Sequence, residues 1–451
     1  MSKKAWASLL IVLLTYINGP FFFIVITPLH RAFYYAVSVF PLFYAVYRGF
    51  RCDINIRNFS LLSLFFFCTI IFVQMVTGAY DFQYLIAFIR SLLNILGTIS
   101  VFAIYQYLKA RNKIAIGFRE ITLKSVVFYI MGSIVFLCVP PLKAFWSSII
   151  TDFQSVDFTN FLEYITRYGF AGFSGFGFTY WVTACAVVFC YMYINGELKE
   201  SQSRIYIIFL LIGSFFYGRT GFVVTVFFFV LLTFYSLFHR KRKLFNFFIF
   251  IVLFFIAVGF ILYFTVPDIQ PFIDWLLEPI LNYIEGGKVE TTSTNGLKNF
   301  YKNFHPTDKT LFLGDGYWID PNGGYYGHTD VGFMRNIYYG GVFFTAAQYI
   351  LVFAIILSVS LWMKNNNKKG VLFIPFLMLM DFVLFELKGD SAFMSLKQFV
   401  PFYLGLVYSK KNDFCLVGTC KTYNLKSQKT VFEKVVKDSL INNNKKILKE
   451  N

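Results

Sequence analysis

The chain has 451 residues, of which 57% are hydrophobic and only 14% are charged, and its mean hydropathy is +0.60. A soluble protein of this length needs far more charge to cover its surface, so the composition excludes an ordinary soluble fold. The formal net charge of +17 does not indicate a nucleic-acid partner, because most of the basic residues fall in loops on one side of the predicted membrane segments.

Apolar blocks recur along the chain, each about 17 to 25 residues long, which is the length that crosses the hydrocarbon core of a bilayer. We therefore expect an all-α polytopic membrane protein rather than a β-barrel, whose strands would alternate in shorter segments. Residues 1–409 form a single predicted membrane domain, and residues 410–451 form a polar, lysine-rich tail. The twelve predicted spans are 5–28, 32–48, 60–77, 85–107, 125–141, 174–194, 203–218, 220–238, 245–266, 339–363, 370–387 and 391–409.

The distribution of Lys and Arg predicts the orientation of these spans. Most of the 41 basic residues lie on the side that carries both termini, and basic residues concentrate in cytoplasmic loops. Both termini and the tail are therefore expected in the cytoplasm. The seven cysteines have no metal-ligand spacing with histidines, and none falls in a predicted outer loop, so we expect neither a disulfide framework nor a metal site.

Two sizeable loops face the opposite side, at about 142–173 and 267–338. The second connects spans nine and ten and is far longer than a usual connection, which makes it a candidate functional region. Within it, PFIDWLLEPILNYIE (271–285) has an apolar face and predicts a helix at the membrane surface. GLKNFYKNF (296–304) predicts a second short helix, and the glycine-rich stretch 314–341 leads into span ten.

Four arginines lie at or near the outer ends of spans: Arg90, Arg167, Arg219 and Arg335. Arg90 falls about five residues inside its span, or roughly 8 Å at 1.5 Å per residue, where a charge usually faces the bundle interior. Snorkelling to lipid headgroups explains any one of these arginines equally well. Arginine binds phosphate in a bidentate manner, so four of them beside the two long loops predict an anion site.

The start of span ten carries two candidate catalytic residues, His328 and Asp330. Thr329 is a possible N-cap with Asp330 in the first turn, and His328 and Arg335 are seven apart, so they could share a helix face. Free N–H groups at the helix start would add to the anion site. Either His328 or Asp330 could accept a hydroxyl proton as a general base, but a favourable interaction with the helix dipole explains Asp330 equally well.

Further polar residues at the outer side are candidates for contact with a sugar. Span eleven ends in FELKGDS, which places Glu386, Lys388 and Asp390 together, although mutual pairing is the simpler explanation. Tyr325 and Tyr326 in the glycine-rich stretch are two more candidates.

The layout and three short motifs resemble the Wzy-type O-antigen polymerases. YGRTGF after span seven is similar to that family's arginine turn, and LFLGDGYW followed by HTDVGFMRNIYYGGV is similar to its loop segment leading into span ten. The likeness in layout covers the whole chain, whereas the likeness in sequence is confined to these motifs.

The resemblance implies a multi-pass enzyme of the bacterial inner membrane that needs no metal, cofactor or nucleotide sugar. Such enzymes join oligosaccharide repeat units, carried on undecaprenyl pyrophosphate, at the periplasmic face. The arginines Arg90, Arg167, Arg219 and Arg335 would then bind the pyrophosphate, and His328 or Asp330 would serve the acceptor hydroxyl. The implied partners are the lipid-linked oligosaccharide, membrane lipid and a chain-length regulator protein.

Three alternatives stay open at this point. An O-antigen ligase shares the layout and the donor but transfers the chain to lipid A-core, and ligases tend to carry a histidine in the same loop, as His328 is here. A lipid-linked oligosaccharide flippase or other transporter would place its polar groups near mid-membrane and would not need a long outer loop. A non-catalytic membrane scaffold would leave the arginines unexplained.

Overall fold

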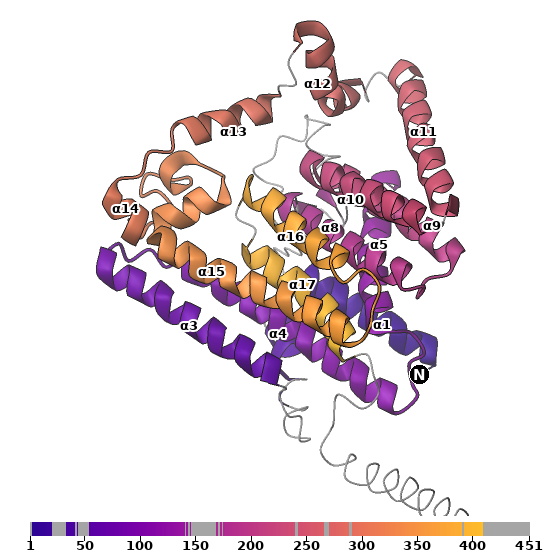
Figure 1. The fold of residues 1–451 in the computed structure, drawn as a ribbon, viewed down its shortest axis with the longest axis horizontal. Helices are drawn as coiled ribbons and strands as arrows, with labels where there is room; N and C mark the ends of the chain where they lie inside the picture. Colours follow the sequence, from indigo (N-terminus) through magenta and orange to yellow (C-terminus); the bar gives the residue numbers. More distant parts are fainter. Residues whose placement is uncertain are drawn as a thin grey trace, which may run out of the picture.

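The structure is a computed structural model, and it is predominantly α-helical (Figure 1). It describes residues 2–19, 33–40, 43, 54–139, 141–142, 145, 168–169, 172–173, 175–239, 242–265, 270–287, 291–389 and 392–408. Within these residues, the only sheet is a short antiparallel pair of β1 (Tyr168–Gly169) and β2 (Gly172–Phe173). The longer helices are α1 (Lys3–Asn18), α3 (Ile54–Thr77), α4 (Gln83–Ala110), α5 (Phe118–Cys138), α8 (Gly175–Ile194), α9 (Glu200–Tyr217), α10 (Arg219–Phe238), α11 (Arg242–Thr265), α12 (Gln270–Gly286), α13 (Thr292–Lys302), α15 (Gly332–Asn365), α16 (Phe373–Glu386) and α17 (Ala392–Val407).

Six helices in the described part of the chain are long and apolar enough to cross a membrane: α3, α4, α8, α10, α11 and α15. Each overlaps one of the predicted spans, which supports the prediction of a helical membrane protein. Five further helices, α1, α5, α9, α16 and α17, coincide with other predicted spans. Of the predicted span 32–48, residues 33–40 and 43 are described, whereas the tail 410–451 lies wholly outside the described residues.

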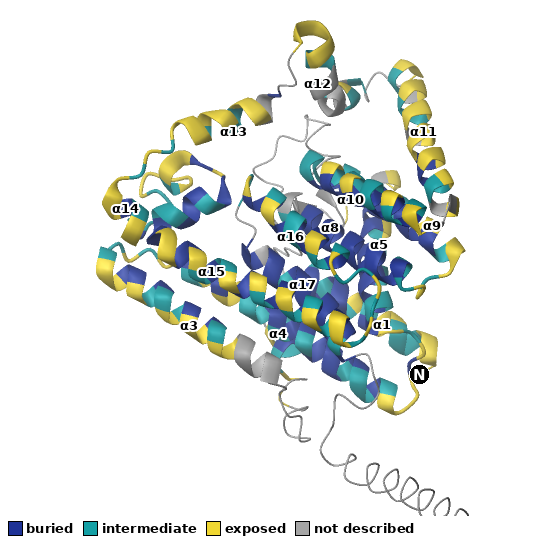
Figure 2. Cartoon of the chain, in the orientation of Figure 1, coloured by how far each residue is buried: buried dark blue, intermediate teal, exposed yellow. Residues whose placement is uncertain are grey.

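Helix α8 forms the centre of the bundle. Its sequence, GFGFTYWVTACAVVFCYMYI, is without charge and apolar on every face, and such a helix is stable only when surrounded. Accordingly, 89% of its membrane-length segment is buried inside the protein, against 12% for α11 at the periphery. Figure 2 shows the same contrast between the dark-blue centre and the exposed α11. The core is therefore built around α8, with α5, α9, α10, α16 and α17 packed against it.

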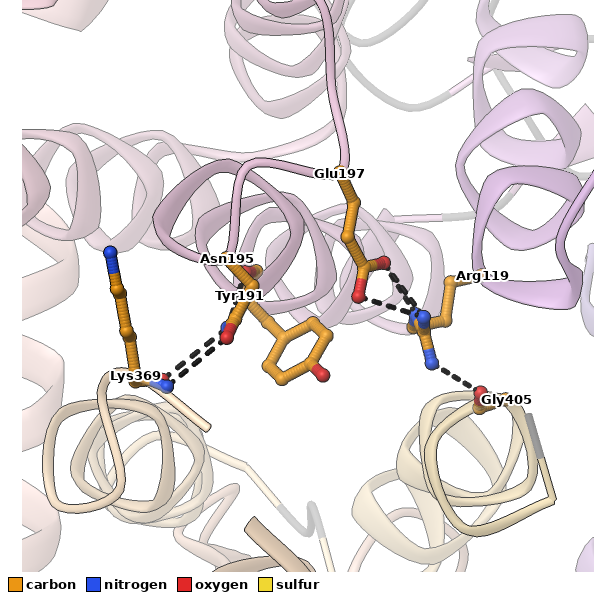
Figure 3. A network of polar contacts seen from close by, with 6 residues as sticks. All are labelled: Arg119, Tyr191, Asn195, Glu197, Lys369 and Gly405. Carbon is orange, nitrogen blue, oxygen red and sulfur yellow. Dashed lines mark hydrogen bonds and ion pairs between the residues drawn. The ribbon is translucent and has the colours of Figure 1, made fainter. Parts of the chain in front are cut away.

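A network of polar contacts closes one end of the bundle (Figure 3). Arg119 in α5 donates to both carboxylate oxygens of Glu197 at 2.7–2.9 Å and to the carbonyl of Gly405 at 2.5 Å. The Asn195 side chain exchanges two hydrogen bonds with the backbone of Lys369, at 3.1 and 3.3 Å. These contacts join α5, the α8–α9 turn, the α15–α16 connection and α17.

The opposite end of the bundle holds the candidate site. Helix α9 starts next to the network around Arg119 and ends at Tyr217, so α10 begins at the far end with Arg219. The connection between α15 and α16 lies in the network, at Lys369. Helix α15 therefore begins at the far end, and α16 ends there. We call it the loop end, defined by Arg219, Gly332 and Glu386. The predicted surface helix is α12, the predicted short helix is α13, and a further short helix, α14 (Asp308–Leu313), follows.

Candidate functional site

The glycine-rich stretch docks onto a break in helix α15. The helix is interrupted at Gly341, whose φ is 74° and ψ is −175°. The N–H groups of Asp315 and Gly316 donate to the carbonyls of Tyr338 and Tyr339 at 2.7 and 2.9 Å. The loop thus satisfies carbonyls that the interrupted helix leaves without their usual i+4 donors.

Close contact between the two backbones requires glycine at this junction. A Cβ on Gly314 would lie 2.4 Å from the carbonyl oxygen of Tyr339, and a Cβ on Gly341 would meet the carbonyl oxygen of Phe312 at a similarly short distance. Both glycines also have φ of 74°, which L-residues with a side chain rarely adopt. Gly314 and Gly341 thus allow the backbone of the loop to pack against the backbone of α15.

Two polar side chains near the α3–α4 turn hold the docked loop. The Asp81 carboxylate accepts from the N–H groups of Trp318 and Ile319 at 2.6 and 2.9 Å. Gln74 in α3 donates to the carbonyl of Gly316 at 2.9 Å. Neither residue is predicted from the sequence, because the contacts of Asp81 and Gln74 span 237 and 242 positions and no local signal marks them.

Arg335 lies in the first turn of α15 and is only 7% exposed. The central carbon of its guanidinium is 3.7 Å from the ring centroids of both Trp318 and Tyr325. The cation is therefore sandwiched between two rings of the glycine-rich loop, an arrangement that stabilises a desolvated guanidinium. Its two planar faces are covered, so the visible role of Arg335 is to tie the loop to α15.

The predicted start of span ten is wrong in detail. Helix α15 begins at Gly332 with Val331 as N-cap residue, so Thr329 does not cap it and Asp330 does not lie in its first turn. Instead, the Thr329 hydroxyl accepts from the N–H of Val331 at 3.2 Å, a local turn that ends before the helix. Asp330 lies one residue before the N-cap, and its side chain is exposed.

His328 also precedes the helix and does not share a helix face with Arg335. It ends a single 3₁₀ turn (η3, Tyr326–His328) and has a φ of 50°, and this turn separates it from α15. Its side chain is exposed. His328 and Asp330 are thus two exposed polar side chains on the turn that leads into α15.

Tyr326 and Asp315 stabilise the inside of the same loop. The Tyr326 hydroxyl donates to one carboxylate oxygen of Asp315 at 3.2 Å, and the Thr310 hydroxyl donates to the other at 2.9 Å. Partial burial, and next the negative charge of Asp315, raise the pKa of Tyr326 to about 12. The phenol therefore stays protonated and acts as a donor within the loop.

Arg219 and Lys388 both lie at the loop end. Arg219 is the first residue of α10 and forms an ion pair of 2.5 Å with Glu278 of α12, with side chains 18% and 21% exposed. Lys388, just after α16, donates to the hydroxyl of Thr220 at 2.8 Å. Thr220 is the next residue after Arg219, so Lys388 contacts the first turn of α10, which also carries Arg219.

The Glu386 side chain contacts helix α15. It is 4% exposed and accepts hydrogen bonds from Asn336 at 3.1 Å and from Tyr349 at 2.8 Å, both on α15. Gly332 packs directly against it, because a Cβ there would lie 2.5 Å from a Glu386 carboxylate oxygen. Glu386 thus helps to fix the start of α15 through its hydrogen bonds to Asn336 and Tyr349.

The other sequence-predicted residues are placed as follows. Arg90 is exposed on α4 rather than turned into the bundle, the position of an arginine that reaches lipid headgroups. Tyr325 is 45% exposed, with its ring against Arg335. Arg167 and Asp390 lie outside the described residues.

No protein-family model matches the chain, and no curated protein is detectably similar to it in sequence. Within the described part of the chain, no three His, Cys, Asp or Glu side chains gather in a way that could hold a metal ion.

Proposed function

We propose that the protein is an O-antigen polymerase of the Wzy type, a glycosyltransferase of the bacterial inner membrane. In this proposal, twelve spans cross the membrane, both termini are cytoplasmic, and the long loop 267–338 faces the periplasm. The observation that carries the proposal is that Arg219 and Lys388, which contacts the neighbouring Thr220, both lie at the loop end, where Arg335 and two exposed candidate bases also lie. The cations suit an anionic leaving group, and membrane-length helices suit a lipid-linked substrate.

The chemistry is transfer of the growing chain from its undecaprenyl pyrophosphate to the next lipid-linked repeat unit. The bond between the anomeric carbon and the pyrophosphate oxygen breaks, and a bond forms between that carbon and a hydroxyl oxygen at the non-reducing end of the acceptor. The acceptor proton passes to a general base, for which His328 and Asp330 are the exposed candidates. Undecaprenyl pyrophosphate leaves with its charge neutralised by the cationic side chains.

This chemistry implies the partners of the protein. The substrate is the lipid-linked oligosaccharide within the membrane lipid, and the sugar contacts fall to Tyr325, Tyr326 and neighbouring residues at the loop end. A chain-length regulator protein is the proposed macromolecular partner. The reaction as written requires no metal and no cofactor.

An O-antigen ligase is the second candidate, and the exposed His328 is the observation that favours it. A ligase would use the same donor but transfer the chain to lipid A-core. The polymerase is preferred because HTDVGFMRNIYYGG resembles the polymerase pattern more closely.

Deletion of the gene in its native host tests the proposal, with the lipopolysaccharide examined on a gel. A polymerase deletion leaves core capped with a single repeat unit. Bare core with accumulated lipid-linked polymer would indicate a ligase, and bare core with lipid-linked units trapped on the cytoplasmic side would indicate a flippase. An unchanged ladder would reject all three functions.

A further inference from the structure

The loop that docks onto α15 lies at the depth of a membrane boundary, and helix α3 gives the first measure of this depth. Residues Ser60–Thr77 of α3 form an apolar segment long enough to cross a membrane. Gln74, in the last turn of that segment, donates to the carbonyl of Gly316 at 2.9 Å. The docked loop is therefore level with the end of a membrane span and does not stand above it.

Helix α15 gives an independent measure of the same depth. After the break at Gly341 the helix continues to Asn365, and the charged Lys364 near its end belongs outside the hydrocarbon core. From Phe343 to Met363 the helix rises about 30 Å at 1.5 Å per residue, which is the thickness of that core. Phe343 consequently marks the boundary of the hydrocarbon at the loop end.

Helix α14 packs against α15 (Figure 1) and presents apolar side chains at this depth. Its last two residues, Phe312 and Leu313, are 54% and 44% exposed. The ring centroid of Phe312 lies 6.3 Å from that of Phe343, which is 71% exposed. Phe343 begins an exposed apolar stripe on α15, which continues at helical spacing with Ile350, Phe353 and Leu357. Helix α14 thus extends the lipid-facing surface of a membrane-spanning helix onto the loop.

The start of α14 has the opposite character to its end. Asp308 and Lys309 are charged and exposed, and they precede the apolar end within the same six-residue helix. A charged start and an apolar end match the change from water to hydrocarbon across the headgroup region. The bilayer is therefore the partner that both ends of α14 fit.

We infer that α14 anchors the loop in the membrane: Phe312 and Leu313 insert among the lipid acyl chains beside Phe343 and hold the glycine-rich loop at the boundary of the hydrocarbon. This anchor requires only that the helices span a membrane, so it does not depend on the polymerase reaction. The loop end then faces the headgroup region, and a ligand with a lipid tail can reach it without leaving the bilayer.

The rate of cysteine labelling measures whether position 312 lies in water or in lipid. The experiment uses the full-length protein in lipid nanodiscs and a water-soluble maleimide, with the natural protein labelled in parallel to give the background from its own cysteines. A thiol reacts as the thiolate, which does not form in hydrocarbon, so Phe312→Cys should react at least about tenfold more slowly than Asn322→Cys. Asn322 is the matched control, because it is an exposed residue of the same loop.

A second measurement identifies what covers the thiol. Monobromobimane is soluble in lipid and labels both positions, and bromine quenches its fluorescence only at close contact. The label at position 312 should lose fluorescence in nanodiscs whose phosphatidylcholine carries brominated acyl chains, whereas the label at position 322 should keep it. If Phe312→Cys does not fold, Phe343→Cys is the second variant, and it should show the same slow labelling and the same quenching.

Equal labelling rates at positions 312 and 322 would overturn the inference, because the end of α14 would then lie in water. Slow labelling without quenching by brominated lipid would also overturn it, because protein would then cover Phe312. Slow labelling with quenching would confirm the anchor even if gene deletion left the lipopolysaccharide ladder unchanged. Failure of the anchor and failure of the polymerase proposal are thus distinguishable.

Discussion

The contacts of Arg335 in the structure differ from those that the sequence predicts. The sequence predicts that Arg335 binds pyrophosphate, because it stands at the start of a span on the outer side. In the structure its guanidinium lies between Trp318 and Tyr325, at 3.7 Å from each ring centroid. These two contacts hold the loop against α15. Arg219 is therefore the better candidate for binding the pyrophosphate of the substrate.

This difference predicts a loss of stability in Arg335→Ala. The variant loses two cation–π contacts, each worth about 1 to 2 kcal/mol when desolvated, and thermal unfolding should occur at a clearly lower temperature. Arg204→Ala is the control, since Arg204 is 51% exposed, and solvent screens both its ion pair with Glu200 and its longer contact of 5.5 Å with the Phe247 ring. An Arg335→Ala protein of natural stability that fails to make polymer would restore Arg335 as a ligand of the substrate.

Substitution of His328 and of His305, two exposed histidines of the loop 267–338, distinguishes a catalytic role from a general effect of changing the loop surface. His328→Ala should lower polymer formation by about a hundredfold or more if His328 is the general base, whereas His305→Ala should leave it unchanged. Both side chains are exposed, so neither substitution is expected to unfold the protein. Equal polymer length in the two variants would remove His328 and leave Asp330→Asn as the variant to measure.

At the scale of elements, the loop 314–316 and the broken helix α15 form one unit. Gly341→Ala or Gly314→Ala should destabilise the protein by about 1–3 kcal/mol or more, since each adds a Cβ at positive φ within contact distance of backbone atoms. Gly323→Ala is the matched control, because Gly323 also has a positive φ but no atom lies within 4 Å of its added Cβ. Limited proteolysis and thermal unfolding measure the difference, and equal losses at all three positions would show that the close contact contributes nothing.

Hydropathy predicted the positions of the long helices well, because a bilayer imposes length and composition on each span. It placed the start of span ten at residue 339, whereas α15 begins at Gly332. The segment GFMRNIYYGG holds an arginine, an asparagine and three glycines, which dilute the apolar signal although the segment is helical.

The contacts that build the candidate site could not be predicted in the same way. Lys388 meets Thr220 across 168 positions, and Asp81 holds Trp318 across 237. Such pairs depend on how helices pack side by side, which a single sequence does not encode in any local pattern. The residue types at the loop end were recognisable from the sequence, but their partners and therefore their roles were not.

At the scale of the whole molecule, the network around Arg119 closes one end of the bundle, and the docked loop with Arg219 and Lys388 occupies the other. The proposed orientation places the first end in the cytoplasm. A reporter enzyme that is active only in the periplasm should be active when fused near residue 300 and inactive when fused near residue 242. The reverse pattern would contradict the orientation and place the candidate site on the wrong side for a periplasmic reaction.

The central claim is that the protein lengthens an oligosaccharide on a lipid pyrophosphate. It is tested most directly with the purified protein and lipid-linked repeat units extracted from a host that lacks the gene, with the products separated by size. The account predicts a ladder of lipid-linked products that differ by one repeat unit, with one undecaprenyl pyrophosphate released for each bond formed. Substrate that stays at a single repeat unit, or that is transferred only when lipid A-core is added, would contradict it.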